Sequence, residues 1–324
     1  MKRIPSVSYN YIANYRSELM GIAMLNVLVL HFISYTGFNH PIWASSILNI
    51  FGRLLFTEIF LFLSGFGIYY SFHKNSSIRS FYLKRTKRFL VPYWIMTLPF
   101  FVGWFISGEI DAVGVLTRFS TLEFWLNGYN TGRWYESVTV FLYLCFPIIY
   151  KCLQKRGGVL FMLMLIIIVI TALYYCLPDY YNKTDIGIVK IPFFIIGAWV
   201  GKQSIEDRRI SIIYIGIMVL ALVLLYIRPV CSWLSVREGV FRLVGLILSC
   251  VLLFYTKEFV VFHRVLQWIG QYTLELYILH TMIFSALPND FANGYVKSFI
   301  AIGGAFIICM PVQKICTCIV SFKK

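Results

Sequence analysis

Residues 19–31 read Leu19-Met-Gly-Ile-Ala-Met-Leu-Asn-Val-Leu-Val-Leu-His31, an apolar run that ends in an imidazole. The run lies within a helix predicted over residues 17–36 and is apolar enough to sit in lipid. A titratable side chain inside a bilayer segment costs free energy, so by default it marks a functional site. We therefore predict that His31 is a catalytic base and that the rest of the chain surrounds and supplies it. On helix 17–36 alone, a histidine that hydrogen-bonds a neighbouring helix explains the pattern equally well.

Composition extends the membrane prediction to the whole chain. The 324 residues are 59% apolar and 13% charged, whereas soluble globular proteins are about 25% charged. Apolar runs of about 20 residues, long enough to cross a bilayer, recur from end to end. We therefore expect an all-α, polytopic transmembrane helical bundle that forms a single domain over residues 1–324. Residues 1–15 lack the layout of a cleavable signal, so the first helix is expected to be retained.

About ten transmembrane helices are expected. The predicted spans are residues 17–36, 47–71, 89–107, 133–150, 158–177, 188–201, 210–227, 239–256, 266–287 and 296–320. Most basic residues fall in alternate connections, which are the N-terminus, residues 72–88, 151–157, 202–209 and 257–264, and the C-terminus. This bias predicts that both termini are cytoplasmic. It also accounts for the net charge of +15, which in a soluble protein would suggest nucleic acid; no nucleic-acid partner is expected here.

The eight cysteines show no spacing typical of a metal site. Those inside apolar runs are expected to act as small hydrophobic residues. Cys176 and Cys231 could pair near the outer face, although packing is favoured for both. Cys316 and Cys318 alone are too few ligands for a metal ion, so no metal is expected.

Glu58 is the second ionisable residue within a predicted span. A carboxylate in lipid should be paired or protonated. Counting back from the shared outer end of the first two helices puts Glu58 near the depth of His31. A carboxylate beside an imidazole fixes its tautomer and stabilises its charged form, so we assign Glu58 a catalytic role. The alternative is an ion pair with Arg53, about one turn away on the same helix.

Arg85 and Arg88 open the predicted helix 89–107 from the cytoplasmic side. A spacing of three places both side chains on one helical face. Two guanidinium groups on one face suit phosphate recognition. The alternative is that these residues only set the topology and touch anionic lipid.

Two further polar groups lie near or within predicted helices. Trp134, Tyr135 and Glu136 precede the apolar part of helix 133–150, where they form either an interfacial belt or a contact with a polar acceptor. Glu275 and His280 lie within an apolar run, and at five residues apart they do not share a face well. They therefore need separate partners, which argues for a polar interior. We assign all five residues to the acceptor side of the site.

Together these segments resemble the acyltransferase-3 family of bacterial membrane O-acyltransferases. The segments that carry the resemblance are Leu19–Ala23 with His31, Glu58 with Phe62–Ser71, Arg85–Arg88 leading to Pro92–Trp94, Trp134–Tyr135 through Tyr143–Pro147, and Ile269–Gly270 through Leu274–His280. Each segment alone is modest evidence. Their order and their spread over nearly the whole chain make the combination specific.

The resemblance implies an enzyme of the bacterial cytoplasmic membrane. It implies an acyl donor, usually acetyl-CoA, taken from the cytoplasm, and a hydroxyl acceptor on an envelope polysaccharide or lipid-linked sugar. It also implies that His31 is the catalytic histidine and that Arg85 and Arg88 form the Arg-x-x-Arg motif that holds the CoA phosphates. Glu58 stands where the family commonly has Asp.

The chain departs from the family pattern at two places. The family's first helix often carries Arg eleven residues before the histidine, where this chain has Met20. Arg16 lies one turn earlier, so we assign it to the donor site with Arg85 and Arg88. An acidic pair that many members carry in the fourth helix is replaced by Thr139 and Val140, which affects the expected handling of the acceptor.

Two other classes of function stay open at this point. A buried histidine and glutamate suit the proton relay of a transporter or flippase for a glycan or lipid. An inactive membrane partner in envelope assembly is also compatible with Met20 in place of Arg. Consumption of a CoA thioester favours the enzyme, whereas gradient-driven flux favours the transporter.

Overall fold

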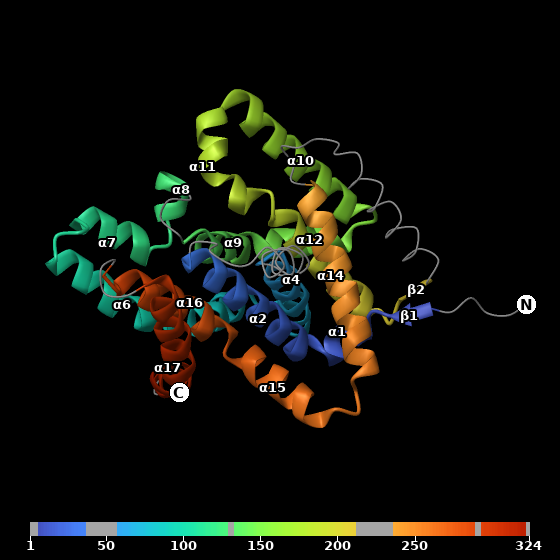
Figure 1. The fold of residues 1–324 in the computed structure, drawn as a ribbon. Coiled ribbons are helices and arrows are strands. Elements are labelled where there is room, and N and C mark those ends of the chain that lie inside the picture. The colour runs from blue at the N-terminus through green and yellow to red at the C-terminus, as the bar shows by residue number, and fades with distance from the viewer. Residues whose placement is uncertain (1–5, 37–56, 129–132, 212–235, 289–292, 322–324) are drawn as a thin grey trace, which may run out of the picture.

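Lipid offers no partners to backbone polar groups, so apolar spans must bond their own backbone as helices. The structure is a computed structural model that describes residues 6–36, 57–128, 133–211, 236–288 and 293–321, and these are mostly helical (Figure 1). Six helical segments in these ranges are long and apolar enough to cross a membrane: Arg16–Tyr35, Ile78–Ile106, Trp134–Gln154, Gly158–Cys176, Pro178–Ile205 and Gly294–Val320. The chain is thus a helical membrane protein, whereas the total of about ten helices and the side on which the termini lie stay predictions.

The described residues form a series of short and long helices and two short strands. In order, they are β1 (Ser6–Ser8), α1 (Asn10–Asn14), α2 (Arg16–Tyr35), α4 (Thr57–Lys74), α5 (Ile78–Arg85), the π-helical turn η1 (Thr86–Leu90), α6 (Val91–Ile106), α7 (Ala112–Phe119), α8 (Glu123–Asn127), α9 (Trp134–Gln154), α10 (Gly158–Cys176), α11 (Pro178–Ile188), α12 (Ile191–Ile205), β2 (Arg209–Ser211), α14 (Val236–Tyr255), α15 (Val260–Gln271), α16 (Thr273–Ala286) and α17 (Gly294–Ser321).

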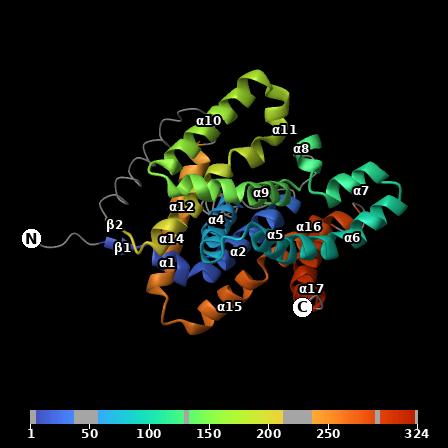
Figure 2. The same cartoon turned by 180° about the vertical axis from the view of Figure 1, so that it is seen from behind.

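The centre of the molecule is formed by α2, α4 and α12. Figures 1 and 2 show α2 and α4 between the α10–α11 pair on one side and the α6, α16 and α17 group on the other. Two glycines let α4 and α12 touch, because a Cβ at Gly65 would overlap the carbonyl oxygen of Phe194 and a Cβ at Gly197 would overlap that of Phe62. Small residues at helix contacts are the usual means of close packing in membranes. This contact fixes the position of α4, which contributes Ser64 to the cavity lining.

The predicted helix over residues 266–287 is two helices in the structure. It breaks at Tyr272, between α15 and α16. Next to the break, the hydroxyl of Thr273 donates a hydrogen bond to the carbonyl oxygen of Gly270 at 2.7 Å. The backbone of Gly270 lies directly against the carbonyl of Ser17 in α2. The break therefore lets α15 pack along the start of α2 while α16 takes a direction of its own.

The predicted helix over residues 89–107 begins earlier than expected. α5, η1 and α6 run without interruption from Ile78 to Ile106. η1 is a single turn of π-helix at Thr86–Leu90. Such turns are rare and occur frequently at functional sites. The basic stretch that we expected as a loop is therefore a helical extension that carries Arg85 and Arg88.

The remaining differences lie in the connections. The segment around 178–187, expected as a loop, is α11, and residues 108–132 contain α7 and α8. β1 pairs with β2 as a short antiparallel ladder, a small departure from the all-α prediction. The ladder places the N-terminal segment beside the connection that follows α12, so both lie on the same side. Most of the predicted helix 210–227 and the cysteine Cys231 lie outside the described residues.

Candidate active site

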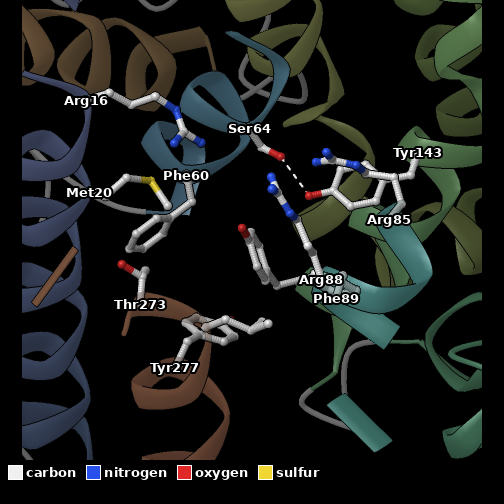
Figure 3. Close-up of a pocket in the computed structure, with 12 residues that line it drawn as sticks. Arg16, Met20, Phe60, Ser64, Arg85, Arg88, Phe89, Tyr143, Thr273 and Tyr277 are labelled. Carbon is white, nitrogen blue, oxygen red and sulfur yellow. Dashed lines mark hydrogen bonds between the residues drawn. The ribbon is translucent and has the colours of Figure 1, made fainter. Parts of the chain in front are cut away.

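A cavity of about 170 Å³ lies where α2, α4, α9, α16 and the η1 region meet (Figure 3). Three guanidinium groups line it, those of Arg16, Arg85 and Arg88. The other lining residues are Met20, Phe60, Ser64, Phe89, Tyr135, Tyr143, Thr273, Leu274 and Tyr277. None of these lining residues is a carboxylate, so the excess positive charge is free to attract an anionic group.

Arg16 reaches the cavity from the first residue of α2. Its Nε donates a hydrogen bond to the carbonyl oxygen of Leu63 in α4 at 3.2 Å. A Cβ at Gly67 would lie 2.9 Å from both Nε and Nη2 of Arg16. The missing side chain at Gly67 therefore makes the room in which this guanidinium lies. The prediction that Arg16 reaches the same region as the Arg-x-x-Arg pair agrees with this geometry.

Arg85 and Arg88 enter the cavity from either side of the start of the π-helical turn. Arg85 Nη2 donates to the hydroxyl of Ser71 at 3.2 Å, and its guanidinium lies 5.9 Å from the ring centroid of Tyr143. Tyr143 in turn bonds the hydroxyl of Ser64 at 3.0 Å. Nε of Arg85 is buried without a hydrogen-bond partner among the described residues. A buried donor of this kind is rare in folded proteins and is available to a bound anion.

His31 lies farther along α2. At about 1.5 Å per residue, it is about 16 Å from Met20 on the cavity wall. Nδ1 of His31 lies 2.6 Å from Nε2 of His280 in α16. His280 is fully buried (0% exposed), whereas His31 is half-buried. The structure therefore pairs two of the predicted site residues, and only His31 is accessible.

One aromatic side chain connects the cavity to the histidine pair. Tyr277 lines the cavity, and its ring lies 6.1 Å from that of His280 at an angle of 80°. On its other side, its ring lies 4.8 Å from that of Tyr135. Tyr277 thus lies between the arginine cavity and the pair formed by His31 and His280.

Glu58 lies in a separate, charged cluster. Its Oε1 is 3.7 Å from Nζ of Lys190 and its Oε2 is 3.5 Å from Nε of Arg242. Lys190 Nζ also lies 3.2 Å from the hydroxyl of Thr57 and 4.3 Å from the ring centroid of Trp134. This carboxylate is therefore neutralised by cations from two other elements, the start of α12 and α14.

The position expected for Glu58 is accordingly wrong. Within the described ranges, the side chain hydrogen-bonded to His31 is His280 rather than Glu58. The position of a residue along a helix does not tell which way its side chain points. The alternative partner Arg53 lies outside the described residues.

The three polar residues at the start of α9 do not form one cluster. Trp134 packs under Lys190, and Tyr135 lines the arginine cavity. Glu136 is buried, and its Oε2 has no hydrogen-bond partner within the described part of the chain. Successive residues of a helix point about 100° apart, so these neighbours face different surroundings.

Glu275 and His280 have separate partners, as their spacing predicted. His280 faces α2, whereas Glu275 is buried near Gln313 of α17. Glu275 is not among the described residues that line the arginine cavity. Among the described residues, no group of three His, Cys, Asp or Glu side chains could hold a metal ion.

A family model described as an acyltransferase domain, that of the acyltransferase-3 family, matches residues 19–313. The chain belongs to the acyltransferase-3 family. No curated protein and no solved structure matches it. The matched range includes His31, Arg85 and Arg88, whereas Arg16 lies just before it. Together with the membrane-spanning helices, the match identifies an integral membrane acyltransferase.

Two sets of residues in this acyltransferase received no role from the sequence. Ser64, Tyr143, Thr273 and Tyr277 line the cavity. Ser64, Tyr143 and Tyr277 lie in segments that carried the family resemblance, and Tyr277 also lies one helical turn before His280. Lys190 and Arg242 hold Glu58. Lys190 was recognisable as a cation on the side where the positive-inside rule expects few.

Proposed function

We propose that this acyltransferase moves an acetyl group from cytoplasmic acetyl-CoA to a hydroxyl of an envelope polysaccharide or lipid-linked sugar, in the bacterial cytoplasmic membrane. The observation that carries the proposal is the cavity lined by Arg16, Arg85 and Arg88 and by no carboxylate. Guanidinium groups bind phosphate oxygens with paired, charge-assisted hydrogen bonds. The phosphates of CoA are a ligand of the matching charge.

The distance between the arginines and His31 supports the same assignment. The cavity wall at Met20 is about 16 Å along α2 from His31. A donor that carries phosphates at one end and a thioester at the end of a long, flexible arm suits this separation. Tyr277, which lies between the cavity and the histidine pair, and Tyr135, which lines the cavity beside it, offer apolar faces to such an arm. A donor held at both ends keeps its thioester close to the acceptor hydroxyl, and this fixed proximity raises the rate of the reaction.

The chemistry assigned to His31 is general base catalysis. Its imidazole takes the proton of the acceptor hydroxyl while the hydroxyl oxygen bonds to the thioester carbon. The bond between that carbon and sulfur then breaks, and the imidazolium returns the proton to the leaving thiolate. An ester and free CoA are formed, and no external oxidant, reductant or metal is consumed.

The test uses inside-out membrane vesicles that contain the protein, native envelope fractions and radiolabelled acetyl-CoA. We expect label to move to a glycan or lipid fraction with the wild type and with His73→Gln, which changes an exposed histidine of α4. We expect no transfer with His31→Gln, and strongly reduced transfer with Arg85→Ala/Arg88→Ala. The labelled product then identifies the acceptor.

Two results contradict the proposal. One is undiminished transfer by folded His31→Gln protein, which removes His31 from the mechanism. The other is absence of transfer by the wild type when other acyl donors have also been supplied. Gradient-driven movement of a glycan without consumption of CoA would favour the transporter instead.

A further inference from the structure

A line of two hydrogen bonds joins the backbone of α16 to the imidazole of α2. The carbonyl oxygen of Leu276 lies 2.6 Å from Nδ1 of His280. Nε2 of the same ring lies 2.6 Å from Nδ1 of His31. Both nitrogens of His280 are therefore engaged, whereas Nε2 of His31 is not part of this line.

The carbonyl at one end of the line determines where the protons are. A carbonyl oxygen only accepts, so Nδ1 of His280 carries a hydrogen. His280 is fully buried (0% exposed), where an imidazolium without a counter-ion is costly, so its ring is neutral and Nε2 carries only a lone pair. The hydrogen between the two rings then belongs to Nδ1 of His31. A neutral imidazole has a single N–H, which leaves the lone pair of His31 on Nε2.

We propose that His280 is a positioning residue that holds His31 in its Nδ1–H tautomer, with Nε2 as the atom that takes the acceptor proton. The catalytic part of this inference rests on the proposed function, whereas the tautomer itself does not. In hydrolase triads a carboxylate performs this task. Here a second imidazole, itself fixed by the Leu276 carbonyl, performs it without placing a negative charge in the membrane interior.

The arrangement also stabilises the intermediate charge on His31. When Nε2 takes the proton of the acceptor hydroxyl, the ring becomes an imidazolium with two N–H groups. Its Nδ1–H already points at the lone pair of His280, and hydrogen bonds from charged donors are the stronger ones. His280 is fully buried, so it acts on the acceptor through His31 rather than by touching it, which differs from the acceptor contact that the sequence suggested.

The first test measures the tautomer by nitrogen-15 NMR of protein labelled at histidine and held in lipid nanodiscs. Signals are assigned by their loss in His31→Gln and His280→Phe. We expect protonated Nδ1 and unprotonated Nε2 for both residues in the wild type. In His280→Phe we expect His31 to revert toward the Nε2–H form that a histidine side chain prefers in water. A wild-type His31 protonated on Nε2 overturns the proposal, and this readout does not depend on acyl transfer or on the identity of the acceptor.

The second test separates a positioning role from simple packing. His280→Gln keeps an acceptor close to the position of Nε2, whereas His280→Phe keeps the ring and removes both nitrogens. We expect His280→Phe to lower kcat by about 100-fold, within the range typical of general base catalysis, with the KM for acetyl-CoA unchanged. We expect His280→Gln to stay within about tenfold of the wild type.

The relative activities of His280→Phe and His280→Gln decide between a positioning role and a role in packing. A role in packing alone predicts the opposite order, because a buried phenyl ring costs less than a buried amide. A phenylalanine variant at least as active as the glutamine variant therefore overturns the positioning role. If His280→Phe does not fold, the wild-type spectrum still decides the tautomer. If the wild type shows the expected tautomer but transfers no acyl group, the result counts against the proposed function and leaves the tautomer assignment in place.

Discussion

At the scale of single residues, the partner decides what a buried ionisable group does. From the sequence alone, His31 and Glu58 were equally good candidates for a catalytic role, since each is a titratable residue in an apolar span. In the structure, His31 is half-buried and bonded to a second imidazole, whereas Glu58 is 4% exposed and lies between Lys190 and Arg242. The first arrangement leaves an atom free for chemistry. The second is typical of a group that holds helices together.

Glu58→Gln is therefore expected to act mainly on stability. The variant leaves Lys190 and Arg242 facing an uncharged amide, and breaking a buried ion pair costs about 3–5 kcal/mol. Thermal unfolding in detergent measures the loss. Glu206→Gln is the control, because its ion pairs with Lys202 and Arg208 are more exposed and are worth at most about 1 kcal/mol. A Glu58→Gln protein of wild-type stability that transfers no acyl group would restore the catalytic role assigned to Glu58.

Arg85→Gln is expected to weaken CoA binding rather than the chemical step. A hydrogen bond to a charged group contributes about 1.5–3 kcal/mol, which corresponds to a Kd for CoA about 10- to 100-fold higher. Isothermal titration with CoA measures this change, and Arg16→Gln should behave in the same way. Arg79→Gln changes an exposed arginine of α5 and should leave the Kd unaltered. Unchanged binding in both cavity variants would exclude the cavity as the donor site.

At the scale of elements, glycines determine how closely helices approach and which side chains fit between them. Gly65 and Gly197 bring α4 and α12 together, whereas Gly67 makes room for a side chain from α2. The apolar pattern of the sequence placed the described parts of these helices within a few residues of their bounds. It did not locate the break at Tyr272 or the π-helical turn at Thr86–Leu90, because both depend on neighbours far away in the sequence.

Gly67→Ala is expected to displace the guanidinium of Arg16 without unfolding the protein. The added Cβ would lie 2.9 Å from Nε and Nη2, and these atoms end a flexible side chain that can move. We expect a several-fold rise in the Kd for CoA, within the range of a weakened charged hydrogen bond, with an unchanged unfolding temperature. Gly103→Ala is the matched control, since a Cβ there meets nothing within 4 Å. Equal effects of the two variants would show that Arg16 does not need this space.

At the scale of the whole molecule, the proposed reaction requires that donor and acceptor reach one site from opposite sides of the membrane. The arginine cavity lies near the start of α2, and His31 lies toward its end. If the start of α2 faces the cytoplasm, as the distribution of basic residues predicts, the nucleotide stays inside while the acceptor arrives from outside.

Single cysteines at the two ends of α10 test this orientation. Arg156 and Asp179 are exposed and flank Gly158–Cys176. In a background with all native cysteines replaced by alanine, a membrane-impermeant maleimide should label Asp179→Cys in intact cells. Arg156→Cys should react only after the membrane is opened. The reverse pattern would place both termini outside and would contradict the direction of transfer.

The sequence by itself determined the class of protein and the approximate positions of the described helices, and it singled out His31, Arg85 and Arg88 as candidate site residues, because hydrophobic length and isolated polar residues are properties that a linear pattern carries. Only the tertiary structure decided that His280 rather than Glu58 bonds His31, and that Tyr277 lies between the arginine cavity and the histidine pair. The position of a residue along a helix gives its depth in the membrane, through the rise of about 1.5 Å per residue. The direction in which it points, and thus its partner, depends on how helices rotate and tilt as they pack, and that follows from contacts between segments distant in the chain.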